Sequence, residues 1–217
     1  MIQDPLEPIP PLLNIPGVRA HFIGLIPGVG VTVPRSEAME RLRPLHRDLL
    51  RQATGDHPLV TAEQVHGAFV AIVDSSKADP ILGADGLVTM RRGLSLGIHV
   101  ADCAPVWIVA RDGSAGALLH SGKKGTELGI ARQGIRSLTA QTGKNADEFL
   151  AVIGPCIRPP CYEVDFASEI ARQAREEGVI EVHDAGVCTA CHPERYYSYR
   201  REKGLTGRML ATLTLLP

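Results

Sequence analysis

The sequence predicts an α+β fold, because segments with strand-like patterns come early and most helical patterns come later, without strict alternation of the two. Between Leu59 and His120 the chain consists mainly of short apolar or alternating runs, separated by clusters of Gly, Asp and Ser. Helical periodicity dominates only after residue 125. No repeat or linker composition divides the 217 residues, so we expect a single domain over residues 1–217.

The first third of the chain should contain an arm, a helix and the start of the sheet. Residues 1–17 are rich in proline and are expected to form an extended N-terminal arm. Residues 36–53 have a helical pattern, with Ser36 as the expected N-cap and Pro44 as the point of a kink or break. The strand-like runs that follow are 68–74, 94–101, 105–111 and 115–120.

The rest of the chain, from about residue 125, combines helices with isolated strands. A helix is expected over residues 125–142, ending at Gly143, and a strand over 148–154. Asp165 is the expected N-cap of a second helix that stops at Gly178. Residues 207–216 favour a strand. The buried faces of the two helices are predicted to carry Leu128, Ala131, Ile135 and Leu138 in the first and Phe166, Ile170 and Ala174 in the second.

Composition and charge exclude several classes of partner. The formal net charge is −1, so the chain offers no basic field that would gather nucleic acid or anionic lipid. It has no apolar stretch of about 18 residues, so no membrane span is expected. The N-terminus lacks the features of a secretory signal, which indicates a cytoplasmic protein. The oligomeric state stays open.

The stretch CTACH, residues 188–192, has the spacing that attaches a c-type haem. Haem attachment normally takes place outside the cytoplasm, and five cysteines in a reducing compartment should mostly be thiols. We therefore expect no haem here. The simpler interpretation is that Cys188 and Cys191 are half-buried thiols near the end of a strand.

Three other stretches carry residues suited to chemistry near strand ends: His66 in TAEQVHG, Cys103 in HVADCAPVW and His120 in ALLHSGKKG. Two imidazoles and a thiolate suit zinc or copper, and three protein ligands leave a position open for water or substrate. The same cysteine and histidines could instead form a Cys-His nucleophile, or be ordinary core residues.

An aromatic and basic cluster near the C-terminus could bind a base or a phosphate, or simply pack and form ion pairs. Its members are Tyr196, Tyr197, Tyr199, Arg200, Arg201 and Arg208.

Taken together, these stretches resemble the bacterial laccase-domain family, also called multicopper polyphenol oxidase, whose members are described as purine nucleoside phosphorylases. The similarity runs from about residue 61 to the end of the chain. The resemblance implies a layered α/β sandwich with mixed sheets flanked by helices. The motifs that carry it, in order, are QVHG, ADGLVT, LGIHVADCAPV, LLHSG, IGPCIRPPCYEV and YYSYRREKGLTGRML.

The resemblance also implies an activity. Phosphorolysis of adenosine, inosine and methylthioadenosine is expected, with adenosine deamination as a second reaction. His66, Cys103 and His120 match the family's metal ligands and are the expected catalytic residues, with zinc as the cofactor and copper as the alternative. A purine nucleoside and phosphate would be the partners. The expected substrate-binding residues are Lys124, Tyr197, Tyr199, Arg200 and Arg201.

Two other functions stay open on the sequence. One is copper-dependent oxidation of phenols, and the other is a binding or regulatory module that keeps the metal without turnover. A single His/Cys/His site favours zinc, because multicopper oxidases need several copper sites and many histidines.

Two segments differ from the family pattern. The region HFIGLIPGVGV lacks the family's N-terminal arginine, and Lys123 and Lys124 stand where members have Trp and Arg. Lysine keeps the charge but loses the bidentate fork of arginine, so phosphate binding is expected to be weaker. The family alignment places CTACH on a strand that approaches the site, with Cys188 as the family-like residue.

Overall fold

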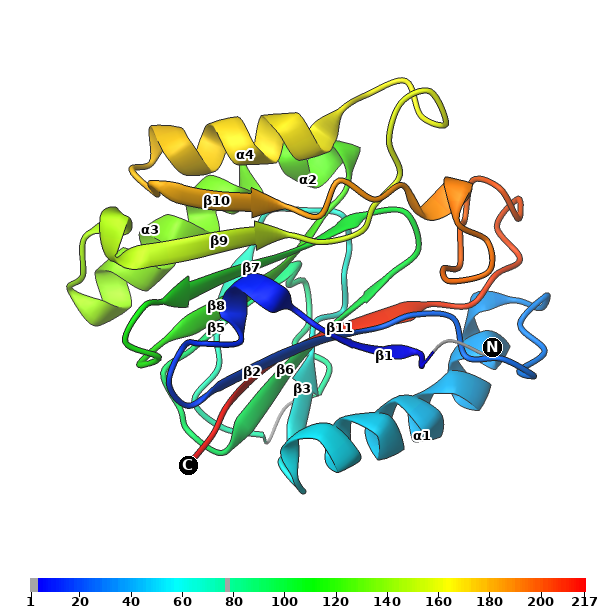
Figure 1. The fold of residues 1–217 in the computed structure, drawn as a ribbon, viewed down its shortest axis with the longest axis horizontal. Helices are drawn as coiled ribbons and strands as arrows, with labels where there is room; N and C mark the ends of the chain where they lie inside the picture. The colour runs from blue at the N-terminus through cyan, green and yellow to red at the C-terminus, as the bar shows by residue number, and fades with distance from the viewer. Residues whose placement is uncertain (1–3, 77–78) are drawn as a thin grey trace.

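The computed structural model describes residues 4–76 and 79–217, and over these residues it contains two mixed β-sheets with α-helices on both outer sides (Figure 1). This arrangement confirms the predicted α+β fold and the layered sandwich. The first sheet has five strands. Their spatial order is β1 (Leu6–Pro8), β2 (Val18–Ile23), β11 (Met209–Leu215), β6 (Leu94–Val100) and β3 (Leu59–Thr61).

The second sheet has six strands and carries most of the chemistry-bearing residues at one end. Its central pairs β7–β8, β7–β9 and β5–β8 are antiparallel, whereas the outer pairs β4–β5 and β9–β10 are parallel. The spatial order is β10 (Glu181–Asp184), β9 (Phe149–Ile153), β7 (Ala104–Ala110), β8 (Gly116–Ser121), β5 (Gly86–Thr89) and β4 (Val70–Ile72).

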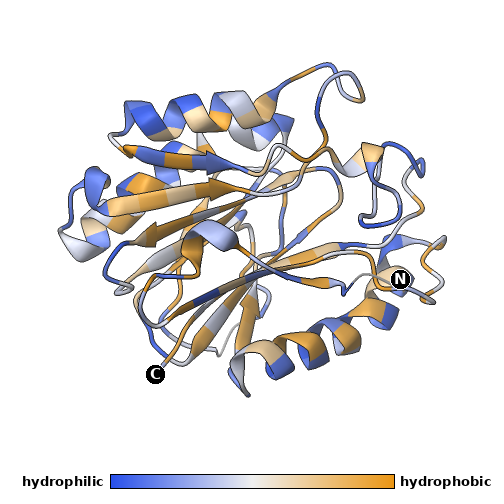
Figure 2. Ribbon diagram, in the orientation of Figure 1, coloured by the Kyte–Doolittle hydropathy of each residue, from blue (hydrophilic) through white to orange (hydrophobic). Residues whose placement is uncertain are grey.

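Helices cover the outer face of each sheet. The short α2 (Lys123–Glu127), α3 (Ile130–Thr142) and α4 (Phe166–Glu176) pack on the six-stranded sheet, and α1 (Arg35–Thr54) packs on the five-stranded sheet. Figure 2 shows apolar residues along the strands and polar residues on the outward faces of the helices. The apolar cores therefore lie between the two sheets and under the helices.

The two sheets are joined by a buried aromatic residue. Trp107 on β7 is fully buried, and its Nε1 donates a hydrogen bond of 2.9 Å to the carbonyl of Thr212 on β11. A Cβ added to Gly116 on β8 would lie 2.6 Å from Leu213 of the facing sheet. The absence of a side chain at Gly116 therefore allows the sheets to approach closely at this point.

The predicted helix over 36–53 exists as α1, but two details of that prediction are wrong. The helix begins one residue earlier, with Pro34 at the N-cap position, so Ser36 lies inside it and caps nothing. Pro44 does not break the helix, which continues to Thr54. Pro44 lies on the exposed side of α1, where water can satisfy the carbonyl that the missing N–H leaves free.

The predicted helix over 125–142 is two helices. Gly129 adopts φ +77° between α2 and α3, a left-handed conformation that interrupts the helix. Leu128 therefore points to solvent with 52% exposure, while Ala131, Ile135 and Leu138 are buried as predicted. Gly143 ends α3 in the left-handed conformation, as predicted.

The prediction for α4 is confirmed. Asp165 accepts a hydrogen bond from the backbone N–H of Ser168 at the N-cap, and the three predicted apolar residues are buried. Strands also form at each of the six strand-like segments predicted from the sequence, including the C-terminal one. The strands β1, β2, β3, β5 and β10 were not among the predicted segments.

The N-terminal arm is more ordered than an extended segment. Within its described part, β1 pairs antiparallel with β2, and a short 3₁₀ helix, η1 (Pro10–Leu12), buries Leu12. Residues 1–3 of the arm lie outside the described residues. Across 4–76 and 79–217, no helix combines the length and apolar character needed to cross a membrane.

His46 provides a test of the packing of α1 on its sheet. The side chain is buried, neither ring nitrogen has a hydrogen-bond partner among the described residues, and burial lowers its pKa to about 4. The unfolded chain takes up a proton near pH 6.5, so the folded state loses stability as the pH falls from about 6.5 to about 4. The loss should be about 3 kcal/mol.

We therefore predict that His46→Leu flattens this part of the pH dependence of the free energy of unfolding, measured by urea denaturation between pH 7 and pH 4. The partly exposed His57 is the matched control, and His57→Leu should keep the wild-type slope. An unchanged slope in His46→Leu would contradict the burial of a neutral imidazole.

Candidate active site

The structure brings His66, Cys103 and His120 together. One ligand atom from each lies within 4.8 Å of the others, and the two imidazole rings meet edge to face with centroids 4.9 Å apart. The β7–β8 register pairs Pro105 with His120, which places Cys103 beside the imidazole at the sheet end. His66 comes from the loop between β3 and β4.

Gly122 allows the thiol to reach this position. A Cβ on Gly122 would lie 2.7 Å from the Sγ of Cys103, which is closer than van der Waals contact permits. The last position of the motif LLHSG therefore requires glycine, because a side chain there would clash with the sulfur atom of Cys103.

Asp85 holds both histidines of the cluster in position through hydrogen bonds. Its carboxylate is fully buried and accepts hydrogen bonds from the backbone N–H groups of Val65, His66 and Gly67, at 2.7–3.1 Å. It also contacts Nδ1 of His120 at 2.8 Å. Because Asp85 occupies Nδ1, the Nε2 of His120 is the nitrogen left to face the cluster.

These contacts determine the protonation of the site. Burial raises the pKa of Cys103, but hydrogen bonds from His120 and His66 outweigh it and lower the pKa to about 6. Burial lowers the pKa of His120, but Asp85 and Cys103 outweigh it and raise the pKa to about 9. Both shifts favour a Cys103 thiolate beside a His120 imidazolium when no metal is bound.

The backbone around the cluster is held in an uncommon conformation. Gln64, His66 and Asp102 have φ values of 66°, 61° and 85°, in the left-handed region that non-glycine residues rarely adopt. Such residues cost on the order of 1–3 kcal/mol each and persist where other contacts fix them.

The contacts that fix them are visible. The side chain of Gln64 pairs with both backbone groups of His99, at 2.6 and 2.9 Å. The carboxylate of Asp102 accepts hydrogen bonds from Thr189 Oγ1, Ser198 Oγ and the backbone N–H of Arg200, at 2.7–3.1 Å. Both residues therefore connect the site to distant segments of the chain.

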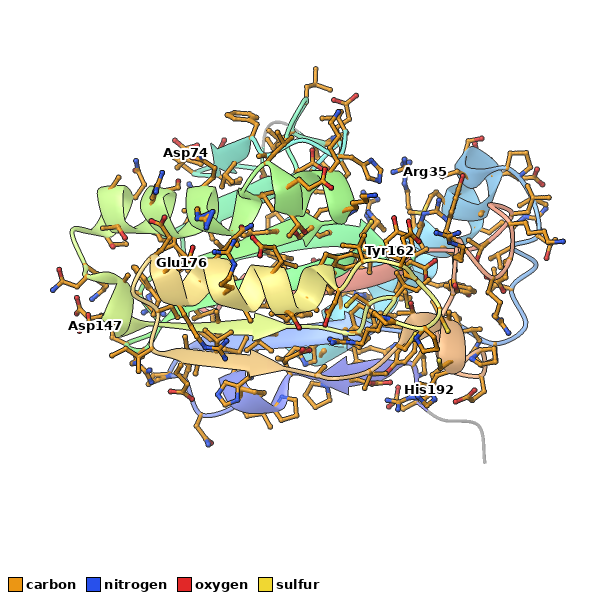
Figure 3. All side chains as sticks on the ribbon, turned by 90° about the horizontal axis from the view of Figure 1, so that it is seen from above. Arg35, Asp74, Asp147, Tyr162, Glu176 and His192 are labelled. Carbon is orange, nitrogen blue, oxygen red and sulfur yellow. The ribbon has the colours of Figure 1, made fainter. Side chains whose placement is uncertain are left out.

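The three-residue cluster opens into a cavity of about 710 Å³ at one end of the sandwich. In Figure 3 two of its lining residues are labelled, with Arg35 on the side of the molecule away from Asp74 and Asp147 and Tyr162 nearer the middle. The lining combines positive charge with aromatic rings. Its cationic members are Arg35, Lys123, Lys124, Arg200 and Arg208, its aromatic members are Tyr162, Phe166 and Tyr199, and the carboxylate of Asp102 also lines it.

The predicted substrate-binding residues divide into two groups. Lys124, Tyr199 and Arg200 line the cavity. Tyr197 lies outside the lining, buried with its hydroxyl bonded to both backbone groups of Ile26, and Arg201 contacts Glu202 at the surface.

Sequence reasoning missed several residues of the site. Asp85 lies in the motif ADGLVT, and Tyr162 lies in the motif IGPCIRPPCYEV. Both motifs were recognised in the sequence, but no function was assigned to these two side chains. Arg208 belonged to the basic cluster but was given no place in the site. Arg35 carried no signal, because it enters the cavity only through the position of α1.

The interpretation of CTACH needs two corrections. Cys188 is half-buried as expected, but Cys191 is exposed. Residues Thr189–Cys191 form a 3₁₀ turn, η3, and not a strand. Cys188 immediately before it forms an isolated parallel bridge with Cys156. The turn reaches the site through Thr189, whose hydroxyl donates to Asp102.

The residues present fit a metal ion. The donor set is two imidazoles and one low-pKa thiol, already gathered, with one imidazole oriented by a buried carboxylate. Three protein ligands leave a position that opens to the cavity, which is the pattern of catalytic and not structural zinc. The same pair of Cys103 and His120 is also suited to nucleophilic chemistry in the metal-free state.

Comparisons with known proteins agree with this arrangement. The profile of the family described as multi-copper polyphenol oxidoreductase laccase matches residues 35–178 and 164–216. The purine nucleoside phosphorylase YlmD of Geobacillus stearothermophilus is 30% identical over 192 residues, covering 70% of each chain. A purine nucleoside phosphorylase of Streptomyces coelicolor is 30% identical over 193 residues, covering 76% of this chain and 78% of its own.

The fold is similar to that of a solved relative. The crystal structure of YlmD from Geobacillus stearothermophilus superposes with a TM-score of 0.79 at 26% identity, covering 94% of this chain and 93% of that one.

The geometry predicts how substitutions change metal binding. His66→Ala should lose about one equivalent of zinc per chain relative to the unchanged protein, measured by elemental analysis of protein purified without added metal. Asp85→Asn should keep the ligands but weaken zinc binding by about 10- to 100-fold in a competition titration, because His120 is no longer held by a carboxylate. His183→Ala, at a site remote from the cavity, is the control. Unchanged zinc content in both His66→Ala and Cys103→Ala would place the metal elsewhere.

Proposed function

The chain belongs to the multi-copper polyphenol oxidoreductase laccase family, and from this premise we propose that it is a zinc-dependent purine nucleoside phosphorylase. The proposed substrates are adenosine, inosine and methylthioadenosine, with phosphate as the second substrate. One observation carries the proposal: the His66–Cys103–His120 cluster opens into a cavity lined by both aromatic rings and cationic side chains.

The cavity suits a nucleoside and a phosphate by size and chemistry. Its volume of about 710 Å³ falls within the ordinary range of small-molecule sites. Tyr162, Phe166 and Tyr199 offer flat faces for a purine. Lys124, Arg35 and Arg208 offer positive charge for a phosphate dianion.

In phosphorolysis the bonds that form and break lie between the two substrates and not in the protein. A phosphate oxygen forms a bond to C1′ of the ribose as the bond from C1′ to the purine nitrogen breaks, and the purine leaves with the electron pair. The protein must hold the dianion in line with the leaving base and stabilise the charge that develops. We assign the first task to the cationic lining and the second to the region around the three-residue cluster.

The metal would be held by His66, Cys103 and His120. When bound, zinc would supply Lewis acidity that polarises a substrate oxygen or a water. Asp85 would keep Nε2 of His120 directed at the cluster throughout. We propose adenosine deamination as a second reaction of the site, in which the same arrangement activates water.

Copper-dependent phenol oxidation is the alternative suggested by the family's description. Two imidazoles and a thiolate also suit copper. Over residues 4–76 and 79–217, however, a single group combines histidine with cysteine, whereas multicopper chemistry uses several copper sites. This observation favours zinc. A metal-bearing binding module without turnover is the third possibility.

The direct test is incubation with a panel of nucleosides, with and without phosphate, followed by chromatography of the products. We expect free adenine from adenosine and free hypoxanthine from inosine only when phosphate is present. Base release without phosphate would indicate hydrolysis, and conversion of adenosine to inosine would indicate deamination. A zinc-loaded protein that changes none of the nucleosides would favour the binding module.

Lys124 provides a test of the phosphate site. Lys124→Ala should raise the phosphate KM roughly tenfold, equivalent to about 1.4 kcal/mol, and Lys124→Arg should lower it, with smaller changes in kcat. The reason is that an arginine fork holds phosphate through two bonds, whereas lysine acts as a point charge. The control is Lys144→Ala, because Lys144 pairs with Asp112 outside the cavity. Equal phosphate KM values in all variants would remove Lys124 from the phosphate site.

A further inference from the structure

A second group of sulfur atoms lies apart from the His66–Cys103–His120 cluster. The Sγ atoms of Cys161, Cys188 and Cys191 all lie within 4.8 Å of one another, and those of Cys161 and Cys191 are 3.4 Å apart. All three are free thiols. Three of the five cysteines of the chain therefore converge at one point, although Cys161 is 27 residues from Cys188 in sequence.

We propose that Cys161, Cys188 and Cys191 form a second metal site, which binds Zn²⁺ and holds one wall of the cavity in place. The proposal does not depend on the reaction that the cavity performs. It depends on the geometry of the three thiols, on the backbone that positions them and on the segments that they join.

The spacing of the sulfur atoms suits zinc. A Zn–S bond of about 2.3 Å in tetrahedral geometry places neighbouring sulfur atoms about 3.8 Å apart. The separation between Cys161 and Cys191 is 3.4 Å, and the other two separations are at most 4.8 Å, so all three are compatible with this value. Small rotations of the side chains would therefore complete the geometry without a change in the backbone.

Backbone hydrogen bonds hold the two segments together independently of a metal. Cys156 and Cys188 form a parallel bridge, in which Cys156 donates to Val187 and accepts from Thr189 at 3.2 and 3.1 Å. Cys191 donates to the carbonyl of Cys188 at 3.2 Å in the 3₁₀ turn. The thiols are thus preorganised, which lowers the entropic cost of binding an ion.

His192 is a candidate fourth ligand by its place in the sequence, although its ring nitrogens do not lie within 4.8 Å of all three sulfur atoms. Structural zinc sites are usually closed by four protein ligands, and Cys₃His is one of the common sets. His192 follows Cys191 directly, and its Nδ1 lies 3.3 Å from the carboxylate of Glu194, which leaves Nε2 as the other donor. Because Cys191 is exposed, water can fill the position if His192 does not.

The site would connect two segments of the cavity wall. Tyr162, next to Cys161, lines the cavity and lies under the guanidinium of Arg200, 4.8 Å from the ring centroid. Thr189, next to Cys188, donates to Asp102, the neighbour of Cys103. Zinc at the three thiols would therefore fix the position of Tyr162 and support Asp102 from the same point.

The test uses the full chain with the first site removed. His66→Ala with Cys103→Ala, freed of metal with a chelator under reducing conditions and then dialysed against Zn²⁺, should retain about one equivalent of zinc per chain. Adding Cys188→Ser or Cys191→Ser should abolish it. Co²⁺ in place of zinc should give strong thiolate charge-transfer absorption that disappears in the same variants.

Cys156→Ala is the matched control, because Cys156 lies beside the cluster without belonging to it, and it should keep the full equivalent. Far-UV circular dichroism checks that each variant is folded. Cys191→Ser should affect folding least, because Cys191 is exposed. The proposal is overturned if the folded first-site variant binds no zinc while its three thiols titrate as reduced, or if Cys188→Ser and Cys191→Ser both keep the metal.

Discussion

The buried carboxylate of Asp85 is the constraint on which the rest of the site depends. It accepts three backbone N–H groups from the His66 loop and contacts Nδ1 of His120, and its own carbonyl accepts the backbone N–H of His120 at 2.7 Å. A buried charge is stable only when its hydrogen bonds are made, and Asp85 makes them with the two elements that carry the imidazoles. Burial raises the pKa of Asp85, but the bond with His120 and those from the loop outweigh it.

Asp102 plays a comparable part on the other side of Cys103. Its carboxylate gathers hydrogen bonds from Thr189, Ser198 and Arg200, which come from the turn and loop that close the cavity. The three-residue cluster is therefore flanked by two buried carboxylates, each of which accepts bonds from a separate segment. Most of the charged side chains that line the cavity are cationic, which suits an anionic second substrate.

The sequence predicted the long periodic elements because their patterns depend on burial alone. It failed where a single backbone conformation decides the outcome, as at Gly129, which divides the expected helix, and at Pro34, which replaces Ser36 at the start of α1. The short strands β3 and β5 have too few residues to show a period. Nevertheless, β3 precedes the loop that carries His66, and β5 directly follows Asp85.

The candidate site was predictable only in part for the same reason. Motif resemblance identified the three proposed metal ligands, but Asp85 acts through backbone amides, which leave no pattern in the sequence. Tyr197 and Tyr199 look alike in the motif, and only the fold shows that one lies in the core and the other in the cavity. The spacing of Cys188 and Cys191 likewise could not show that Cys161 joins them.

The central claim is that Asp85 organises His66, Cys103 and His120 into a site that holds zinc. The most direct measurement is anomalous X-ray diffraction at the zinc absorption edge, on crystals of protein purified without added metal. The account predicts an anomalous peak bonded to these three side chains, with Asp85 still on Nδ1 of His120. A peak at the copper edge instead, or no metal at this cluster while Cys103 remains unmodified, would contradict it.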